Sequence, residues 1–400
     1  MAEIQINIER LKRNLLEVAS IANAGERGYT RPAFSKEEKL ALDWLRQKLS
    51  ELSLSVSQDR VGNVFGKWGK PNEPAILFGS HLDTVPEGGL FDGVLGVVAG
   101  LECLQTLIEH GYRPEVPLEM ACFVGEEANP LGGTFGSRAV AGLIAHSEDL
   151  ERKVNDQQFT WDDLVSVKRT NRDFRCFLEL HIEQGSLLET CNNKIGIVTA
   201  IAGILRLSVR VNGRASHSGT TPMHLRRDAL VDASLLIQKV NQLAVEANSD
   251  IVATVGEIAI FPNLANVVPG QAQLTIEIRG SNWDEMKAIE RAIRDWSSQN
   301  IDAEIAITVE KHPNSLSESI QSCIEQACRD VKASYQYMFS GANHDANSLI
   351  ALTNVGMIFV PSKDGISHHP DEFTSWEDIE IGTNVMLQTI LRLADQYSRD

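Results

Sequence analysis

The sequence is poor in basic residues and has no closely spaced cysteine pair. Lysine and arginine number 37 against 54 acidic residues, which gives a net charge of −17. Nucleic acids and anionic membranes both reward basic patches, so this charge argues against either as a partner. The cysteines mostly lie in apolar runs without a CxxC pair, which favours buried thiols in a reducing cytoplasm over disulfides or thiolate metal ligands. They are Cys103, Cys122, Cys176, Cys191, Cys323 and Cys328.

A long hydrophobic run is also missing at the start of the chain. Residues 1–20 interleave charged and apolar residues at helical spacing, so we predict neither a signal peptide nor a transmembrane span. We therefore expect a cytoplasmic protein. With 43% hydrophobic residues, the 400-residue chain can bury a sizeable core and is long enough for two or three domains.

Three polar residues stand between a predicted strand and a predicted helix. The apolar run at residues 75–78 predicts a buried strand, and the apolar stretch at residues 94–108 predicts a helix. His81, Asp83 and Asp92 lie between them. Ligands of open α/β sheets bind in the crevice at the carboxyl ends of the strands. An imidazole there, with one carboxylate two residues on and another at a helix start, fits a metal ligand set and its supporting groups.

The same arrangement recurs after three further apolar runs. These runs are residues 118–124 before Glu126 and Glu127, residues 176–180 before His181, and residues 355–360 before His368. Any one of these polar residues is most simply an ordinary surface residue, but four strand ends with one pattern favour a shared metal site. Imidazole and carboxylate ligands suit zinc, manganese or cobalt, and a bridging carboxylate suits two ions roughly 3.5 to 4 Å apart.

The pattern of the sequence changes near Ile204. Before it, apolar strands alternate with helical segments, which is typical of a parallel sheet covered by helices on both faces. After it, strict alternation of apolar and polar residues predicts half-exposed strands. The β, α, β, β, α and β elements fall at residues 205–211, 225–247, 251–261, 271–279, 284–299 and 303–309. This order is the ferredoxin-like split motif, and the buried-strand pattern returns after His312 and Pro313.

We therefore expect an α/β protein with a mostly parallel sheet and an inserted ferredoxin-like βαββαβ domain. The metal-binding domain is predicted to be discontinuous, with residues 1–204 and 315–400, and the insertion spans residues 205–314. One face of such a small sheet is covered by helices, but its edges are unprotected, and an exposed edge pairs readily with a second copy. We expect a lid and dimerisation domain; the alternative is a monomer with a mobile lid.

Three polar residues of the insertion look too specific to be scaffold alone. His217 lies in a loop of small residues, Asn266 in a turn-rich connection, and Arg279 at the end of an alternating strand. Taken alone, Arg279 is more simply a solvated strand residue. Arginine is nevertheless the residue that grips a planar carboxylate with two parallel hydrogen bonds. The three could clamp a small anionic substrate.

At this point the sequence resembles a known family. The segments that carry the resemblance are HLDTVPEGGLFDG, GEE, HIEQG, ASHSGTTPM, NLANVVPG, SGANHDA and GISHHPDE. They resemble the dinuclear amidohydrolase branch of the aminoacylase and carboxypeptidase G-like metallopeptidases. Within it they are similar to N-carbamoyl-L-amino acid amidohydrolases, allantoate amidohydrolases and β-ureidopropionases. The resemblance runs from about Leu11 to Leu393. His181 distinguishes the ureido-cleaving branch from peptidase relatives, which usually have a carboxylate at that position.

The resemblance implies roles for the metal-site residues. It implies that one ion is held by His81, Asp92 and His181, and the other by Asp92, Glu127 and His368. The two divalent ions would be zinc, manganese, cobalt or nickel. By the same resemblance, Asp83 orients His81 and Glu126 is the general base. His368, rather than His369, matches the family ligand.

The resemblance also implies the substrate contacts. Gln184 would contact the ureido amide, Asn266 and Arg279 the substrate carboxylate, and His217 the oxyanion, with His344 a weaker candidate. The implied reaction is metal-dependent hydrolysis of a ureido C–N bond, which releases ammonia, carbon dioxide and an amino acid. An allantoate amidohydrolase or a β-ureidopropionase is the alternative within the ureido class. Outside that class, the alternatives are an aminoacylase or exopeptidase of the same fold and then a non-catalytic binding protein.

Two departures from the family pattern leave the substrate open. Asn343 stands where relatives commonly have glycine, and residues 128–131 read Ala-Asn-Pro-Leu where relatives have a glycine-rich continuation. Neither position is a predicted ligand.

Overall fold

The computed structural model describes residues 4–24, 27–247 and 250–399. The chain forms two compact units. The first runs to Thr199 and resumes at Leu316, and the second is Ala200–Ser315. The second unit thus starts slightly before the expected residue 205 and ends at Ser315 rather than at residue 314.

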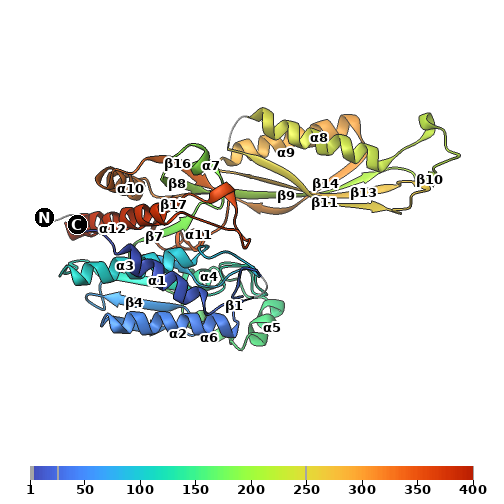
Figure 1. Cartoon of the computed structure of the whole chain (residues 1–400). Coiled ribbons are helices and arrows are strands. Elements are labelled where there is room, and N and C mark those ends of the chain that lie inside the picture. Colours follow the sequence, from blue (N-terminus) through green and yellow to red (C-terminus); the bar gives the residue numbers. More distant parts are fainter. Residues whose placement is uncertain (1–3, 25–26, 248–249, 400) are drawn as a thin grey trace. The chain divides into compact units, whose positions relative to one another are not determined.

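The first unit is built on a mixed sheet whose centre is parallel (Figure 1). In spatial order its strands include β8 (Ile195–Ile201), β17 (Asn354–Val360), β7 (Phe174–Ile182), β5 (Ala75–His81), β6 (Leu118–Phe123), β4 (Val64–Trp68) and β3 (Ser55–Gln58). The four strands β17, β7, β5 and β6 are mutually parallel. Their flanks are antiparallel, and β16 (Tyr335–Ser340) also pairs with β8. All four apolar runs of the sequence lie in the parallel strands, which confirms the predicted fold class.

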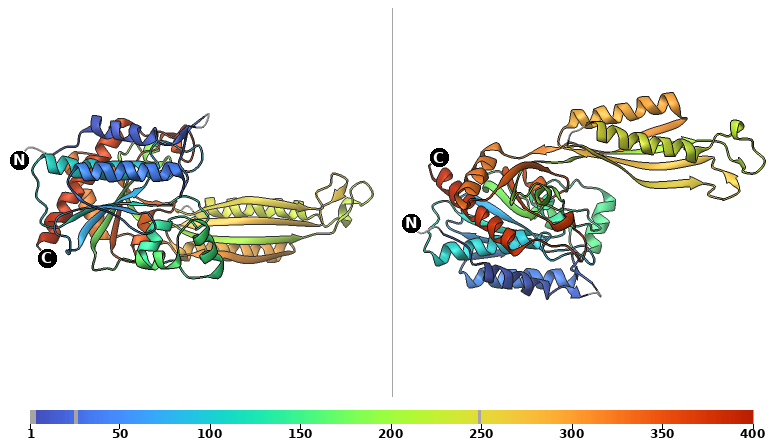
Figure 2. Two further views of the ribbon diagram at one scale, coloured as in Figure 1. Left: turned by 90° about the horizontal axis from the view of Figure 1, so that it is seen from below. Right: turned by 45° about the horizontal axis from the view of Figure 1, so that its top comes forward.

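Helices cover both faces of this sheet (Figures 1 and 2). They are α1 (Ile8–Ala19), α2 (Lys36–Glu51), α3 (Val94–Glu109), α4 (Phe135–Ala141), α5 (Glu148–Asp156), α6 (Trp161–Ser166), α7 (Leu187–Thr190), α10 (Glu318–Val331), α11 (Asp345–Leu349) and α12 (Trp376–Ser398). Short elements are β1 (Asn23–Ala24), β2 (Tyr29–Thr30) and the 3₁₀ turn η2 (Lys363–Gly365). Every residue of β5 is buried, which explains why that strand reads as a continuous apolar run.

The order in which strands are added to the sheet reverses at β5, and the candidate site lies at this reversal. The connection from β5 through α3 leads to β6 on one side, whereas β7 and then β17 lie on the other side. Because strand–helix–strand connections are right-handed, α3 and the crossover from β6 to β7 cover opposite faces. Such a switch point opens a crevice at the carboxyl ends of the strands.

The second unit is a four-stranded antiparallel sheet with two helices on one face (Figure 1). Its elements are β9 (Gly203–Asn212), β10 (Ser216–His217), η1 (Met223–Leu225), α8 (Ala229–Ala247), β11 (Val252–Phe261), β12 (Val267–Val268), β13 (Gln271–Gly280), α9 (Trp283–Asn300), β14 (Ala303–Lys311) and β15 (Asn314–Ser315). The sheet order is β11-β13-β9-β14. Leu205, Leu207 and Val209 are fully buried while Arg210 is exposed, so the alternation read from the sequence matches the covered and open faces.

Two further features bear on expectations from composition. No helix among the described residues is both long and apolar enough to cross a membrane. The six cysteines are free thiols, and Cys103, Cys122, Cys176 and Cys328 are buried.

Candidate metal centre

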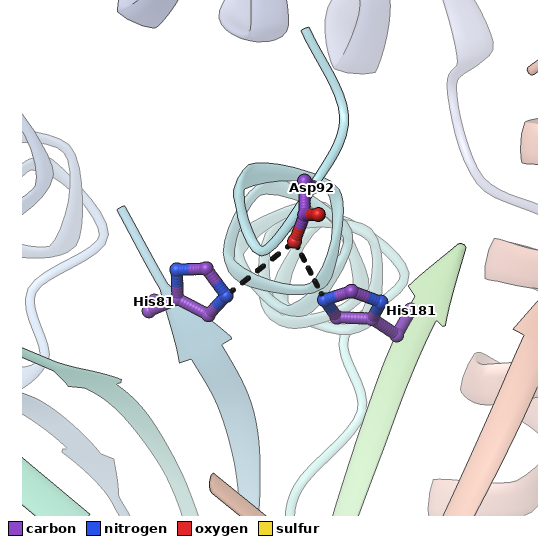
Figure 3. A group of neighbouring side chains, drawn as sticks. All are labelled: His81, Asp92 and His181. Carbon is purple, nitrogen blue, oxygen red and sulfur yellow. Dashed lines mark ion pairs between the residues drawn. The ribbon is translucent and has the colours of Figure 1, made fainter. Parts of the chain in front are cut away.

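The first donor group is formed where β5, β7 and the start of α3 meet. His81 is the last residue of β5, His181 lies near the end of β7, and Asp92 precedes α3. Figure 3 shows both imidazole rings turned toward one carboxylate oxygen of Asp92. His181 Nε2 lies 3.1 Å and His81 Nε2 lies 3.7 Å from Asp92 Oδ1. All three residues are buried. The sequence placed these residues at strand and helix ends, and the structure brings them together.

The second donor group shares Asp92 with the first. His368 Nε2 lies 3.3 Å from Asp92 Oδ2 and 3.4 Å from Glu127 Oε1. Glu127 follows β6, and His368 lies in the loop after β17. The two oxygens of Asp92 therefore face different groups, which is the arrangement expected of a carboxylate that bridges two ions.

These spacings are close to those of ligands on a metal ion. In each group the candidate donor atoms all lie within 4.8 Å of one another. Zinc binds nitrogen and oxygen at about 2.0 to 2.2 Å, so two donors on one tetrahedral ion lie roughly 3.4 Å apart. The four separations given above, 3.1 to 3.7 Å, bracket that value. The chain therefore contains a candidate metal centre whose donor chemistry suits zinc, manganese or cobalt.

Backbone carbonyl groups orient the two buried imidazoles. His81 Nδ1 lies 3.0 Å from the Asp83 carbonyl oxygen, and His181 Nδ1 lies 2.9 Å from the Ile182 carbonyl oxygen. A proton on each Nδ1 leaves the lone pair on Nε2 as an acceptor. In His181 that lone pair accepts the Gly93 N–H at 3.2 Å, a contact that a bound ion would replace. The resemblance implied that Asp83 orients His81, and the contact is made by the Asp83 carbonyl, with the carboxylate farther away at 3.5 Å.

The Asp83 carboxylate instead holds the turn that carries the two glutamates. Its two oxygens accept hydrogen bonds from the backbone N–H groups of Glu126 and Glu127, at 3.2 and 3.0 Å. The Glu126 carboxylate lies 3.7 Å from His81 Nε2 and belongs to neither donor group. The Glu126 carboxylate therefore lies beside the candidate ligands without being one of them, which is the position expected of a general base.

The neighbouring carboxyl groups differ in proton affinity. Burial raises the pKa of Glu126 well above its ordinary value, although the charge of His81 opposes the shift. Burial and the charge of Asp92 raise the pKa of Glu127 to about 7. For Asp92, burial is outweighed by the charge of His181, and its pKa lies well below the ordinary value. Glu126 is therefore the better proton acceptor, and Asp92 the more persistent anion.

A polar chain supports Asp92 from the side of the His368 loop. Gln184 Nε2 and Ser367 Oγ both donate to Asp92 Oδ2, at 2.7 and 2.9 Å. Glu372 Oε1 accepts the backbone N–H groups of Phe91 and Asp92, at 2.9 and 3.1 Å. The side-chain oxygen of Gln184 is buried and has no hydrogen-bond partner among the described residues, so it offers an acceptor beside the donor groups.

Two more histidines occupy distinct positions. The ring of His344 lies 4.6 Å from the ring of His181, and its Nε2 is 2.8 Å from Ser340 Oγ. His369 accepts the Asp371 N–H through Nδ1 and is half exposed. The structure thus places His368, and not its neighbour, against the donor groups.

The second unit does not gather its three predicted residues in one place. His217 lies in β10, which pairs with β12, and the Ser218 N–H donates to the carbonyl of Asn266 at 3.0 Å. Arg279 lies near the far end of β13, where it pairs with Ile204 and its Nε donates to Glu277 at 2.7 Å. Residues 271 and 279 are separated by roughly 26 Å of extended strand. A single copy of this unit therefore separates Arg279 from the other two, and their contact with substrate stays a prediction.

Comparison with known proteins gives the family. The model of peptidase family M20/M25/M40 matches residues 77–392, which include both donor groups. The chain belongs to peptidase family M20/M25/M40.

Relatives in this family are similar over nearly the whole chain. An N-carbamoyl-L-amino-acid amidohydrolase of Paenarthrobacter aurescens is 35% identical and covers 96% of this chain and 98% of its own length. An allantoate amidohydrolase of Bacillus subtilis is 32% identical, with 94% and 95% covered. A hydantoinase/carbamoylase family amidase of Burkholderia multivorans superposes with a TM-score of 0.88 at 30% identity, with 98% of each chain covered. This M20 family chain is accordingly a hydrolase, as the sequence predicted.

Sequence reasoning missed several residues that build this M20 site. Glu38, Ser367 and Glu372 contact the ligand-bearing segments, but none follows an apolar run in the way the ligands do. A weak signal existed for Ser367 and Glu372, because both belong to the GISHHPDE segment. Glu38 lies on α2, and nothing in its surroundings marks it.

Proposed function

We propose that this chain hydrolyses the carbamoyl C–N bond of an N-carbamoyl-L-amino acid or a closely related ureido acid, with two divalent ions. The observation that carries the proposal is the buried side-chain oxygen of Gln184 beside the donor groups, which has no hydrogen-bond partner in the part of the chain that the structure describes. A terminal carbamoyl group ends in an NH₂, which is the donor that such an acceptor would bind. An N-acyl group ends in carbon and would leave the oxygen unsatisfied, which costs about 1 to 3 kcal/mol.

The side chains present divide the chemistry between them. Two bound ions would lower the pKa of a water between them and polarise the carbonyl. His81, Asp92 and His181 would hold one ion, and Asp92, Glu127 and His368 the other. Glu126 would take a proton from the attacking water and deliver it to the leaving nitrogen. One C–N bond breaks, and the resulting carbamate decomposes, so that the products are the amino acid, ammonia and carbon dioxide.

The substrate contacts of the second unit belong to the same proposal. Arg279 and Asn266 would take the substrate carboxylate, and His217 would stabilise the oxyanion. A single oxyanion donor is typically worth about 2.7 to 4 kcal/mol of barrier. Allantoate and N-carbamoyl-β-alanine are the alternative ureido substrates. An aminoacylase or exopeptidase activity is the alternative outside the ureido class.

A substrate panel tests the proposal. Purified protein is assayed with N-carbamoyl-α-amino acids, N-carbamoyl-β-alanine, allantoate, N-acetyl amino acids and dipeptides, each with manganese, cobalt, nickel and zinc. We expect a carbamoyl substrate to give the highest kcat/KM. Faster cleavage of an N-acetyl amino acid or a dipeptide would reject the ureido assignment in favour of the aminoacylase or exopeptidase activity.

We also propose that the chain dimerises through β11. This strand is an edge of the four-stranded sheet, and Val252, Ile258 and Phe261 on it are exposed. Exposed apolar edges are templates for pairing with a second copy. Sedimentation at micromolar concentration should give the mass of a dimer. Ile258→Lys should reduce it to a monomer, while Ile307→Lys on the opposite edge strand β14 should not. A monomeric wild-type protein would contradict the proposal.

A further inference from the structure

The backbone of residues Gly125, Glu126 and Glu127 is held on its N–H side by two buried carboxyl groups. The Gly125 N–H donates to Glu38 Oε1 at 3.2 Å. The next two N–H groups donate to the two oxygens of Asp83, at 3.2 and 3.0 Å. Both acceptor residues are buried.

The carbonyl side of the same turn is held by one amide side chain and two backbone N–H groups. Asn129 Nδ2 lies 2.8 Å from the carbonyl oxygens of both Gly125 and Glu127. The Gly125 carbonyl also accepts the Phe135 N–H at 2.9 Å, and the Glu126 carbonyl accepts the Thr134 N–H at 2.7 Å. Asn129 also accepts the Leu131 N–H through Oδ1 at 2.8 Å. All six backbone polar groups of the turn therefore have a partner, and Asn129 supplies two of them.

We propose that Asn129 and Glu38 are positioning residues that fix the directions of the Glu126 and Glu127 side chains. The proposal rests on the proposed function for the role of Glu126 as base. These two residues grip opposite sides of Gly125, whose positive φ of 63° sets the turn. A misplacement of about 1 Å in a catalytic group can cost on the order of 10²-fold in rate. Asn129 lies in residues 128–131, the segment that departs from the family pattern, so the proposal assigns that segment a role.

The chemistry of the contacts explains why an amide and a carboxylate are needed. Two carbonyl oxygens face Asn129, so the position requires an NH₂ group with two protons. Aspartate has the same shape but offers only acceptors, which would repel both carbonyls. Two N–H groups face Glu38, since its Oε2 accepts the Phe34 N–H at 2.5 Å. Glutamine there would turn an NH₂ group toward one of them.

The test is a metal titration of Asn129→Asp, followed by kinetics. The donor group with Glu127 should lose affinity by about 10 to 100-fold, as is typical of changes to groups that support ligands. The group of His81, Asp92 and His181 should be unchanged, because none of those residues lies in the turn. We expect two resolved Mn²⁺ affinities in calorimetry of the metal-free protein. With saturating metal, kcat should fall at least tenfold while KM stays within about twofold.

Two further variants keep the outcome interpretable. Glu38→Gln should reproduce the selective loss of one ion, and it serves if Asn129→Asp does not fold. Asn300→Asp is the matched control, because Asn300 is exposed and its Nδ2 donates to the Trp296 carbonyl in the second unit; both affinities should stay at the wild-type values there.

Equal weakening of both ions in Asn129→Asp and Glu38→Gln would overturn the proposal, since it would mean general destabilisation. Unchanged affinities together with kcat within threefold of wild type would also overturn it. If the wild-type protein cleaves no carbamoyl substrate but the selective loss of one ion appears, the proposed function fails and the positioning of Glu127 stands.

Discussion

The two units of this chain distribute their polar residues in different ways. In the first unit, the candidate ligands follow four neighbouring parallel strands or precede the helix after one of them, and all of them meet. In the second unit, Arg279 lies near one end of β13, while Asn266 precedes the other end and lies beside β10, which carries His217.

The difference follows from strand direction. Parallel strands all end at one edge of the sheet, so residues that follow them converge whatever their distance along the chain. Antiparallel strands end alternately at opposite edges, so residues near strand ends in such a sheet are divided between two places. His217, Asn266 and Arg279 can therefore act on one substrate only if a structure larger than a single sheet brings them together.

The strongest test of convergence is to remove the shared ligand. Asp92→Ala should abolish binding of both ions and all activity, because Asp92 belongs to both donor groups. His368→Ala should weaken only one ion. Both losses should exceed the roughly 10 to 100-fold typical of changes to supporting residues. Metal analysis and calorimetric titration measure this, with exposed Asp371→Ala as the control. Equal loss of both ions in His368→Ala would disprove the division into two groups.

A second test separates the base from the ligands. Glu126→Gln should retain both ions and the fold but lose about 10² to 10⁴-fold in kcat, because the amide fills the same volume and cannot accept the proton. Glu127→Gln, the adjacent residue in the turn, should lower metal affinity. Activity of Glu126→Gln above about a tenth of wild type would remove Glu126 from the mechanism.

The convergence also explains what could be predicted from the sequence. His81, Glu127, His181 and His368 each follow an apolar run, so local pattern alone placed them at one sheet edge. Glu372 could not be found this way, because its contact with the Phe91 N–H joins residues 281 positions apart. The β10–β12 pairing was also missed. Two strands of two residues each are too short to show alternation.

A third test concerns the second unit and the role of Arg279. If Arg279 grips the substrate carboxylate, Arg279→Lys should lower kcat/KM by more than about thirtyfold, or roughly 2 kcal/mol, since an ammonium lacks the planar fork. Arg206→Lys is the matched control, because Arg206 binds the same Glu277. A surface arginine should change kcat/KM by no more than about 0.5 kcal/mol. A loss below about threefold in Arg279→Lys would make Arg279 a scaffold residue.

The last prediction concerns the stability of the first unit, where the strand ends bring buried carboxyl groups together. Asp345 at the start of α11 is fully buried, and burial together with the charge of Glu179 raises its pKa from 3.8 to about 8. The native protein therefore holds a proton there that the unfolded chain releases. This contribution to stability is complete below about pH 4 and is lost as the pH rises through 8. Asp345→Asn has no such proton to lose. Urea unfolding of the metal-free protein should therefore show the free energy of unfolding of the variant gaining on that of wild type as the pH rises from 5 to 8, and levelling off by pH 9. A constant difference between the two proteins across that range would mean that Asp345 is already ionised in the native state. The carboxyl groups that are brought together at the strand ends would then stay ionised in the native protein, although they are buried.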